Sequence, residues 1–167
     1  MVVIQRILMR KKFGRTSVFA ALIVGFAGAP LLADAADSPA EVVKMRLEGL
    51  RQLGAAFKNV NDELKSSAPN AYLLELFARQ IRDAAKEQYN WFPAGSGPQP
   101  GIKTGAKPEI WEKPADFKAA QDAFAAQAAS FMEVVSSKDV EKIRAQTKPL
   151  SQSCGGCHRT FRTEEKH

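Results

Sequence analysis

The chain has 167 residues, of which 45% are hydrophobic, 8% aromatic and 25% charged. This length suits one domain with its own core, and such a composition is not typical of a disordered chain. The formal charge of +6 comes from 24 Lys and Arg against 18 Asp and Glu, but five of the basic residues and only one acid lie before Ala36. The remaining 132 residues carry a net charge of +2, which argues against nucleic acid as a partner.

The first 35 residues have the three parts of a secretory signal peptide. A basic stretch to Arg15 precedes an uncharged apolar run over Val18–Leu32, and small residues follow at Ala33 and Ala35. The apolar run contains two glycines and a proline, and it is shorter than the roughly 20 residues that span a bilayer. We therefore expect residues 1–35 to be a signal peptide cleaved after Ala35, with export to the periplasm and no stable membrane span afterwards.

The mature chain, residues 36–167, is predicted to be one all-α domain, because no segment alternates apolar and polar residues as a strand does. A first helix over about 38–66 is indicated by apolar residues at steps of three and four. Its predicted buried stripe consists of Val43, Leu47, Leu50, Gly54 and Phe57. A second helix is expected to begin with Pro69 in its first turn and to end near 88, with Leu73, Leu74, Phe77 and Ile81 facing inward.

A long connection and two more helices follow. Residues 90–114 contain five of the nine prolines and four of the eleven glycines, which predicts an extended crossover. A third helix over about 115–136 repeats Phe117, Phe124 and Phe131 at seven-residue intervals, a pattern typical of a bundle seam.

The fourth helix is expected to begin at Ser136 or Ser137, where Ser136 and Asp139 resemble a capping box. Because Pro149 lies inside it, a kink or break is expected near residues 145–148. Four helices with one long connection predict an antiparallel four-helix bundle.

Both cysteines and one of the two histidines lie in Cys154-Gly155-Gly156-Cys157-His158. This is the Cys-x-x-Cys-His pattern of a c-type haem attachment site. On a helix the two thiols and the imidazole can leave the same side of one turn. Two thioether bonds would then fix the edge of a porphyrin while His158 binds the iron, so the motif predicts one covalent haem c near the C-terminus.

Three other interpretations of the cysteines are a structural disulfide, a thiol oxidoreductase site and a zinc site. A thiol oxidoreductase motif normally occurs in a fold with a β-sheet, for which this sequence gives no signal. A zinc site would require the terminal His167 to join Cys154, Cys157 and His158. The export signal, the motif and the helical pattern together favour haem.

At this point the chain resembles the class II c-type cytochromes, the cytochrome c′ family. The resemblance covers nearly all of the mature chain. It includes the run Val43–Arg46, the segment Lys107–Trp111, and the terminal motif followed by Phe161 and Arg162. It implies that Cys154 and Cys157 are the thioether cysteines, that His158 is the axial ligand, and that Arg46 and Arg162 lie near the haem.

The resemblance also implies that a residue of the first helix covers the other face of the iron. Leu50 matches the apolar position of five-coordinate family members, whereas low-spin members use a methionine. Met45 lies about 140° around the helix from Leu50, so the two side chains should not face the same point. We therefore expect no sixth protein ligand, although Met45 stays an alternative.

Two functions follow from a haem c in this setting. The first is a periplasmic carrier of single electrons between redox partner proteins. The alternative is a gas-binding protein in which Leu50 controls the access of nitric oxide or carbon monoxide. A third, non-haem hypothesis is a small helical thiol protein. We find no signature of a hydrolytic or transfer enzyme, and the resemblance implies a possible homodimer through the outer faces of the first two helices.

Overall fold

The computed structural model describes residues 38–163, so the predicted signal peptide lies outside the described residues. The helices, in chain order, are α1 (Pro39–Leu64), α2 (Ala71–Glu87), the 3-10 turn η1 (Gln88–Asn90), α3 (Glu109–Glu112), α4 (Pro114–Ser136) and α5 (Val140–Phe161). The described range contains two isolated β-bridges and no strand, which confirms the all-α prediction. None of its helices is long and apolar enough to cross a membrane.

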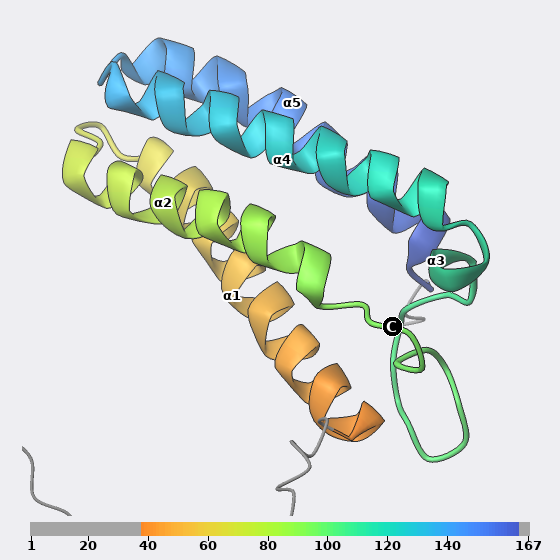
Figure 1. Cartoon of the computed structure of the whole chain (residues 1–167). Helices are drawn as coiled ribbons and strands as arrows, with labels where there is room; N and C mark the ends of the chain where they lie inside the picture. The colour runs from red at the N-terminus through yellow and green to blue at the C-terminus, as the bar shows by residue number, and fades with distance from the viewer. Residues whose placement is uncertain (1–37, 164–167) are drawn as a thin grey trace, which may run out of the picture. The chain divides into compact units, whose positions relative to one another are not determined.

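The four long helices form a bundle, as predicted (Figure 1). Short turns join α1 to α2 and α4 to α5, and α2 packs against α4. Figure 1 shows these two turns together at one end, while the α1–α2 pair and the α4–α5 pair diverge toward the other end. That other end carries the long connection over residues 88–113, in which α3 is a short helix that the sequence pattern did not indicate.

Local hydrogen bonds fix where the helices begin. Ser38 caps α1 in a capping box, because its hydroxyl accepts from the Glu41 amide while the Glu41 carboxylate accepts from the Ser38 amide. Asp139 caps α5 by accepting from the Lys142 amide. The predicted start of this helix at Ser136 was wrong, because the Ser136 hydroxyl instead donates to the Met132 carbonyl and so belongs to the last turn of α4.

Both predictions made from prolines also need correction. Pro69 does not lie in the first turn of α2 but precedes it, and Asn70 caps the helix by accepting from two backbone amides. Pro149 does not break α5, which runs continuously from Val140 to Phe161. The neighbouring Leu150 is fully buried and anchors this turn in the core, while Ala145, whose carbonyl the proline cannot bond, is exposed to water.

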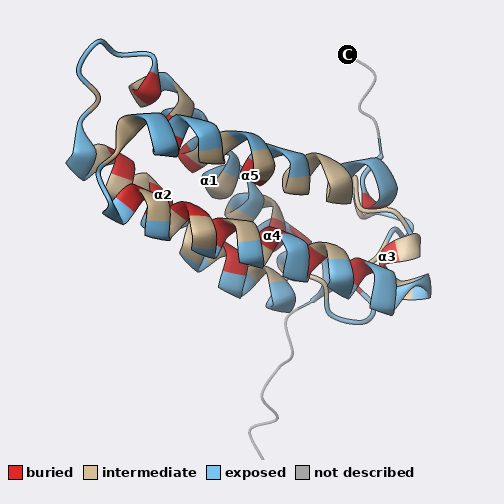
Figure 2. Cartoon of the chain, turned by 90° about the horizontal axis from the view of Figure 1, so that it is seen from above, coloured by how far each residue is buried: buried red, intermediate tan, exposed pale blue. Residues whose placement is uncertain are grey.

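The main core lies between all four long helices. The predicted phenylalanine seam of α4 is confirmed, since Phe117, Phe124 and Phe131 are 7%, 5% and 0% exposed. Figure 2 shows the buried residues recurring along the inner sides of the helices. The main cluster consists of Ala56, Val60, Leu64, Leu74, Ala78, Ile81, Ala85, Phe124, Ala128, Phe131, Val135, Ile143 and Leu150.

The predicted stripe of α1 was partly wrong. Val43 is buried, and Leu47 and Phe57 are half-buried, but Leu50 and Gly54 are exposed. The buried residues of α1 are instead Val43, Arg46, Ala56, Val60 and Leu64. The connection packs against the N-terminal half of α1 at Arg46 and Gly49, whereas Leu50, one residue further along, is left exposed.

Candidate functional site

The Cys-x-x-Cys-His motif lies in the last two turns of α5. Both cysteines are free and half-buried. Cys154 packs against the main core, whereas Cys157 packs against a second cluster formed by Ile110, Phe117 and Phe161. His158 is the exposed member of the motif. The two thiols therefore lie on the inner side of α5, with the imidazole beside them.

Desolvation disfavours the charged forms of the two thiols and of the imidazole of the motif. It raises the pKa of both thiols, that of Cys157 to about 11, with the neighbouring Cys154 as a smaller cause. Although His158 is exposed overall, the partial desolvation of its side chain, and to a lesser extent the positive charge of Arg162, lowers the pKa of His158. At neutral pH the imidazole is therefore neutral and keeps a nitrogen lone pair for a metal. Reactive redox cysteines have lowered pKa values, so this environment disfavours the thiol oxidoreductase interpretation.

Leu50 of α1 is an apolar side chain that the protein leaves uncovered. It lies on the same side of the helix as the buried Val43 and the half-buried Phe57, yet it is 37% exposed. Met45 is 54% exposed on another side of α1, and Met132 packs against the main core. Neither methionine shares the face of Leu50, in agreement with the helical angle expected from the sequence.

Arg46, one turn before Leu50, is only 1% exposed. Its guanidinium donates to the Ser96 hydroxyl and carbonyl, both at 3.1 Å, to the Thr104 hydroxyl at 3.0 Å, and to the Trp91 carbonyl at 3.4 Å. It also lies 4.8 Å from the centre of the Phe92 ring. No acid pairs with it among residues 38–163, so this buried cation is held by neutral groups only.

The partners of Arg46 are residues that the sequence pattern did not identify as functional. They lie 45 to 58 positions away in the chain, in a segment that prolines and glycines mark only as a loop. The one available signal was the clustering of aromatic and small polar residues there, which includes Trp91, Phe92 and Ser96. Arg162, in contrast, is exposed, and its backbone pairs with Ala106 of the same connection.

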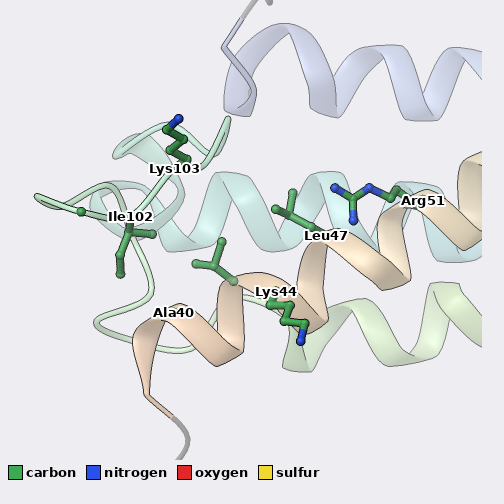
Figure 3. Close-up of a pocket in the computed structure, with 8 residues that line it drawn as sticks. Ala40, Lys44, Leu47, Arg51, Ile102 and Lys103 are labelled. Atoms are coloured by element: carbon green, nitrogen blue, oxygen red, sulfur yellow. The ribbon is translucent and has the colours of Figure 1, made fainter.

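A pocket of about 260 Å³ lies between α1 and the connection (Figure 3). Val43, Leu47 and Ile102 give it apolar walls, and Figure 3 shows the cationic side chains of Lys44, Arg51 and Lys103 around it. This volume is below the 300–1,000 Å³ common for whole small-molecule sites.

These features fit a haem. A porphyrin is flat and apolar and carries two carboxylates, so it suits an uncovered leucine together with nearby cations. Two free thiols three residues apart, with an adjacent neutral imidazole, supply the donor set for covalent attachment. We therefore identify the diverging end of the bundle, between α1 and the last turns of α5, as the candidate site.

Comparisons with known proteins agree with this fit. A cytochrome c′ of Alcaligenes xylosoxydans xylosoxydans is 27% identical over 128 residues, which cover 76% of this chain and 97% of that protein. A solved cytochrome c′ with ligand-controlled dimer dissociation superposes with a TM-score of 0.73 at 23% identity, covering 78% of this chain and all of the other.

A nitric oxide complex of a leucine-to-alanine variant of cytochrome c prime from Alcaligenes xylosoxidans superposes with a TM-score of 0.69 at 24% identity. The match covers 77% of this chain and 98% of that one. The family model of cytochrome c′ matches residues 41–162, which include all but the first two residues of α1, the long connection and the whole Cys-x-x-Cys-His motif. The chain therefore belongs to the cytochrome c′ family and is a haem c protein, with two cysteines that fit a single covalent attachment site.

Proposed function

We propose that this protein binds a diatomic gas at a haem c whose iron has His158 as its only protein ligand. In this proposal Cys154 and Cys157 form the two thioether bonds. Leu50 covers the opposite face without binding the iron. When bound, the haem supplies an iron that exchanges one electron and takes nitric oxide or carbon monoxide at its open position.

The observation that carries this proposal is the exposure of Leu50. An apolar side chain on the inner face of a bundle helix is normally covered by its neighbours, but Leu50 is 37% exposed. Met45 projects from another side of α1, which supports an iron with no methionine ligand. The nitric oxide complexes solved for the Alcaligenes relatives support a gas as the ligand class.

Arg46 has a positioning role in this proposal. Four donor contacts tie it to the connection that closes this end of the bundle. It is also a buried cation with only neutral partners among the residues the structure describes, so a nearby propionate carboxylate would be a favourable neighbour. Arg162 adds positive charge beside His158, and this charge already lowers the pKa of the imidazole.

The absorption spectrum of the reduced protein tests the proposal. Protein made in cells that attach haem is first checked by a pyridine haemochrome assay, which identifies two thioether bonds. The variant His158→Ala should lack the native spectrum. The reduced wild-type protein should then show a high-spin spectrum that shifts with carbon monoxide. Sharp α and β bands that carbon monoxide leaves unchanged would refute an open position, and absence of haem would favour the helical thiol protein.

A second function, single-electron transfer, is favoured by the exposure of the attachment site. The motif lies in the last turns of α5, at one end of the bundle, and Gly155 and Gly156 are only half-buried, so the attached edge of a cofactor would lie near the surface, where a redox partner protein can approach. Reversible one-electron cycling in protein-film voltammetry would support this function. A haem that the electrode and small mediators cannot oxidise or reduce would exclude it.

We further propose that residues 1–35 are removed on export to the periplasm and that residues 36–167 form the mature domain. The basic, apolar and small-residue order of the leader supports this. N-terminal sequencing of the purified holoprotein should begin at Ala36. A chain that still begins at Met1 would contradict the cleavage.

Exposed apolar and aromatic side chains on α1 and α2 support the proposal of a homodimer. Tyr72 and Leu76 are 73% and 38% exposed, and they are four residues apart on one face of α2, while Met45 is exposed on α1. Dimer dissociation is described for one structural relative. Sedimentation of wild type and of Tyr72→Asp/Leu76→Asp should distinguish a dimer from a monomer, and a wild-type monomer at all concentrations would exclude it.

A further inference from the structure

One face of α5 carries positive charge past the Cys-x-x-Cys-His motif. Lys148, Gly155 and Arg159 are spaced by seven and four residues, so they lie along one side of α5, and Arg162 follows directly after Phe161, the last residue of the helix. All three cations of this set are exposed. At about 100° per residue, His158 lies between this side and the buried side of Cys154 and Cys157. The charged face therefore runs beside the candidate haem site.

Contacts between the end of α5 and the long connection bring a further cation, Lys107, next to this charged face. The guanidinium of Arg159 lies over the two glycines of the motif, since a Cβ atom on Gly155 would be 3.3 Å from its Nη1. The ammonium group of Lys107 donates to the Arg159 carbonyl at 3.3 Å, and the amide of Thr163 donates to the Gly105 carbonyl at 2.8 Å. We call Lys107, Lys148, Arg159 and Arg162 the basic surface.

The basic surface has no compensating acid of its own. Residues 142–163 contain no Asp or Glu, and neither do residues 88–108. The nearby α3 carries Glu109 and Glu112, but none of the ion pairs found within residues 38–163 involves these acids or the four cations. Elsewhere on the helices, most exposed charges are paired locally, for example Lys118 with Asp122 at 2.7 Å.

We propose that the basic surface docks a redox protein that presents a cluster of carboxylates, which brings that partner beside the haem. This inference rests on the electron-transfer function proposed above and names the chemistry of its partner. Unpaired positive charges attract an acidic surface over a distance of about 10 Å at 0.1 M salt. This attraction raises the rate at which the two proteins associate. The face between Lys148 and Arg159 carries Ser151, Gln152 and Gly155, which offer no apolar side chain for insertion into a lipid surface.

Oxidation of the reduced holoprotein by two reagents of opposite charge tests the proposal. In each reaction one electron leaves the haem, and either hexacyanoferrate(III) becomes hexacyanoferrate(II) or tris(phenanthroline)cobalt(III) becomes the cobalt(II) complex. The test variant is Lys148→Gln/Arg159→Gln. The control is Lys65→Gln/Lys142→Gln, which removes the same charge at the opposite end of the bundle, from Lys65 directly after α1 and from Lys142 in the first turn of α5 (Figure 1).

At about 0.1 M ionic strength, the anionic reagent should oxidise the test variant about threefold or more slowly than the wild type. The cationic reagent should oxidise the test variant faster than the wild type. Both effects should vanish at about 1 M salt, where the screening length is only about 3 Å, and the control should change less. Equal effects of the two variants, or no charge dependence, would overturn the proposal. Binding of the wild-type holoprotein, but not the test variant, to vesicles of anionic lipid would also overturn it, in favour of a membrane surface.

The same samples separate this proposal from the function on which it depends. A pyridine haemochrome assay and complete reduction by dithionite show whether a redox-active haem is present at all. If either fails, the proposed function fails. If both succeed and the two double variants react alike, the basic surface alone is refuted.

Discussion

The guanidinium of Arg46 donates to both the hydroxyl and the carbonyl of Ser96, at 3.1 Å each. These two residues are separated by 50 positions, and both are 1% exposed. A buried pair of this kind joins α1 directly to the long connection. The connection is thus held in place by a charged group of the bundle, as well as by aromatic packing.

Arg46→Leu should therefore loosen the connection. The substitution removes the Arg46 donor of the buried Ser96 carbonyl, and an unsatisfied buried group of this kind costs about 1–3 kcal/mol. The Ser96 hydroxyl still donates to the Pro93 carbonyl, and the Thr104 hydroxyl still accepts from the Ala106 amide. Hydrogen–deuterium exchange of residues 91–104 should accelerate, while the α4 amides stay protected. Arg51→Leu is the matched control, because the Arg51 side chain is 72% exposed on the same helix. Unchanged exchange in Arg46→Leu would show that the aromatic contacts suffice.

Gly49 should tolerate no side chain, because the Trp91 ring lies against it. A Cβ atom on Gly49 would be 2.6 Å from Cζ2 of Trp91, so the ring would have to move. Gly49→Ala should destabilise the protein by about 1–3 kcal/mol in urea unfolding. Gly54→Ala, on the same helix, adds a Cβ atom that would have no neighbour within 4 Å, so it should instead stabilise the protein by up to about 1 kcal/mol. Equal effects of both variants would contradict this contact.

Leu50→Ala should raise the affinity for carbon monoxide. Removing the larger side chain frees space on the face that we assign to the gas, so the dissociation constant measured by titration of the reduced protein should fall about tenfold or more, or about 1.4 kcal/mol. Met45→Ala is the control and should change neither the affinity nor the spectrum, since Met45 is 54% exposed. A spectral change in Met45→Ala would assign the sixth position to this methionine.

Phe131→Ala should cause a large loss of stability. Phe131 is 0% exposed at the centre of the main core, and truncation of such a residue costs about 3–5 kcal/mol through lost burial and the cavity that remains. The urea midpoint of the holoprotein should fall strongly. Leu76→Ala, at a 38% exposed position of α2, should shift it little. A small loss in Phe131→Ala would mean that the bundle collapses around the cavity.

Asp62 should stabilise the fold only above acidic pH. Hydrogen bonds from Lys58 and Lys65 lower its pKa from 3.8 to about 2. Because the folded-state pKa is the lower one, this contribution is complete above about pH 4 and is lost as the pH falls through about 2. The difference in urea midpoint between wild type and Asp62→Asn should shrink from pH 5 to pH 2. The effect should be small, since both ion pairs are exposed, and a difference that is constant with pH would contradict it.

Local patterns in the sequence determined the helices, the bundle and the attachment motif. The interval of Phe117, Phe124 and Phe131 gave the core face of α4, because helical periodicity depends only on neighbours in the chain. The spacing of Cys154, Cys157 and His158 predicted a haem attachment site, because this motif also consists of neighbours in the chain. Local patterns did not determine where every helix begins. The Ser136 hydroxyl could cap α5 or bond within α4, and in the structure it donates to the Met132 carbonyl of α4.

Only the tertiary structure decided which part of the apolar stripe of α1 is covered. Leu50 and Val43 look alike in the sequence, yet Val43, which lines the pocket together with Ile102 of the connection, is buried, whereas Leu50 is exposed. The tertiary structure also decided that Arg46 is buried and holds the connection through hydrogen bonds. Its partners lie 45 to 58 residues away, so no periodicity within one helix predicts these contacts. Contacts of that range depend on how the helices and the long connection pack against one another.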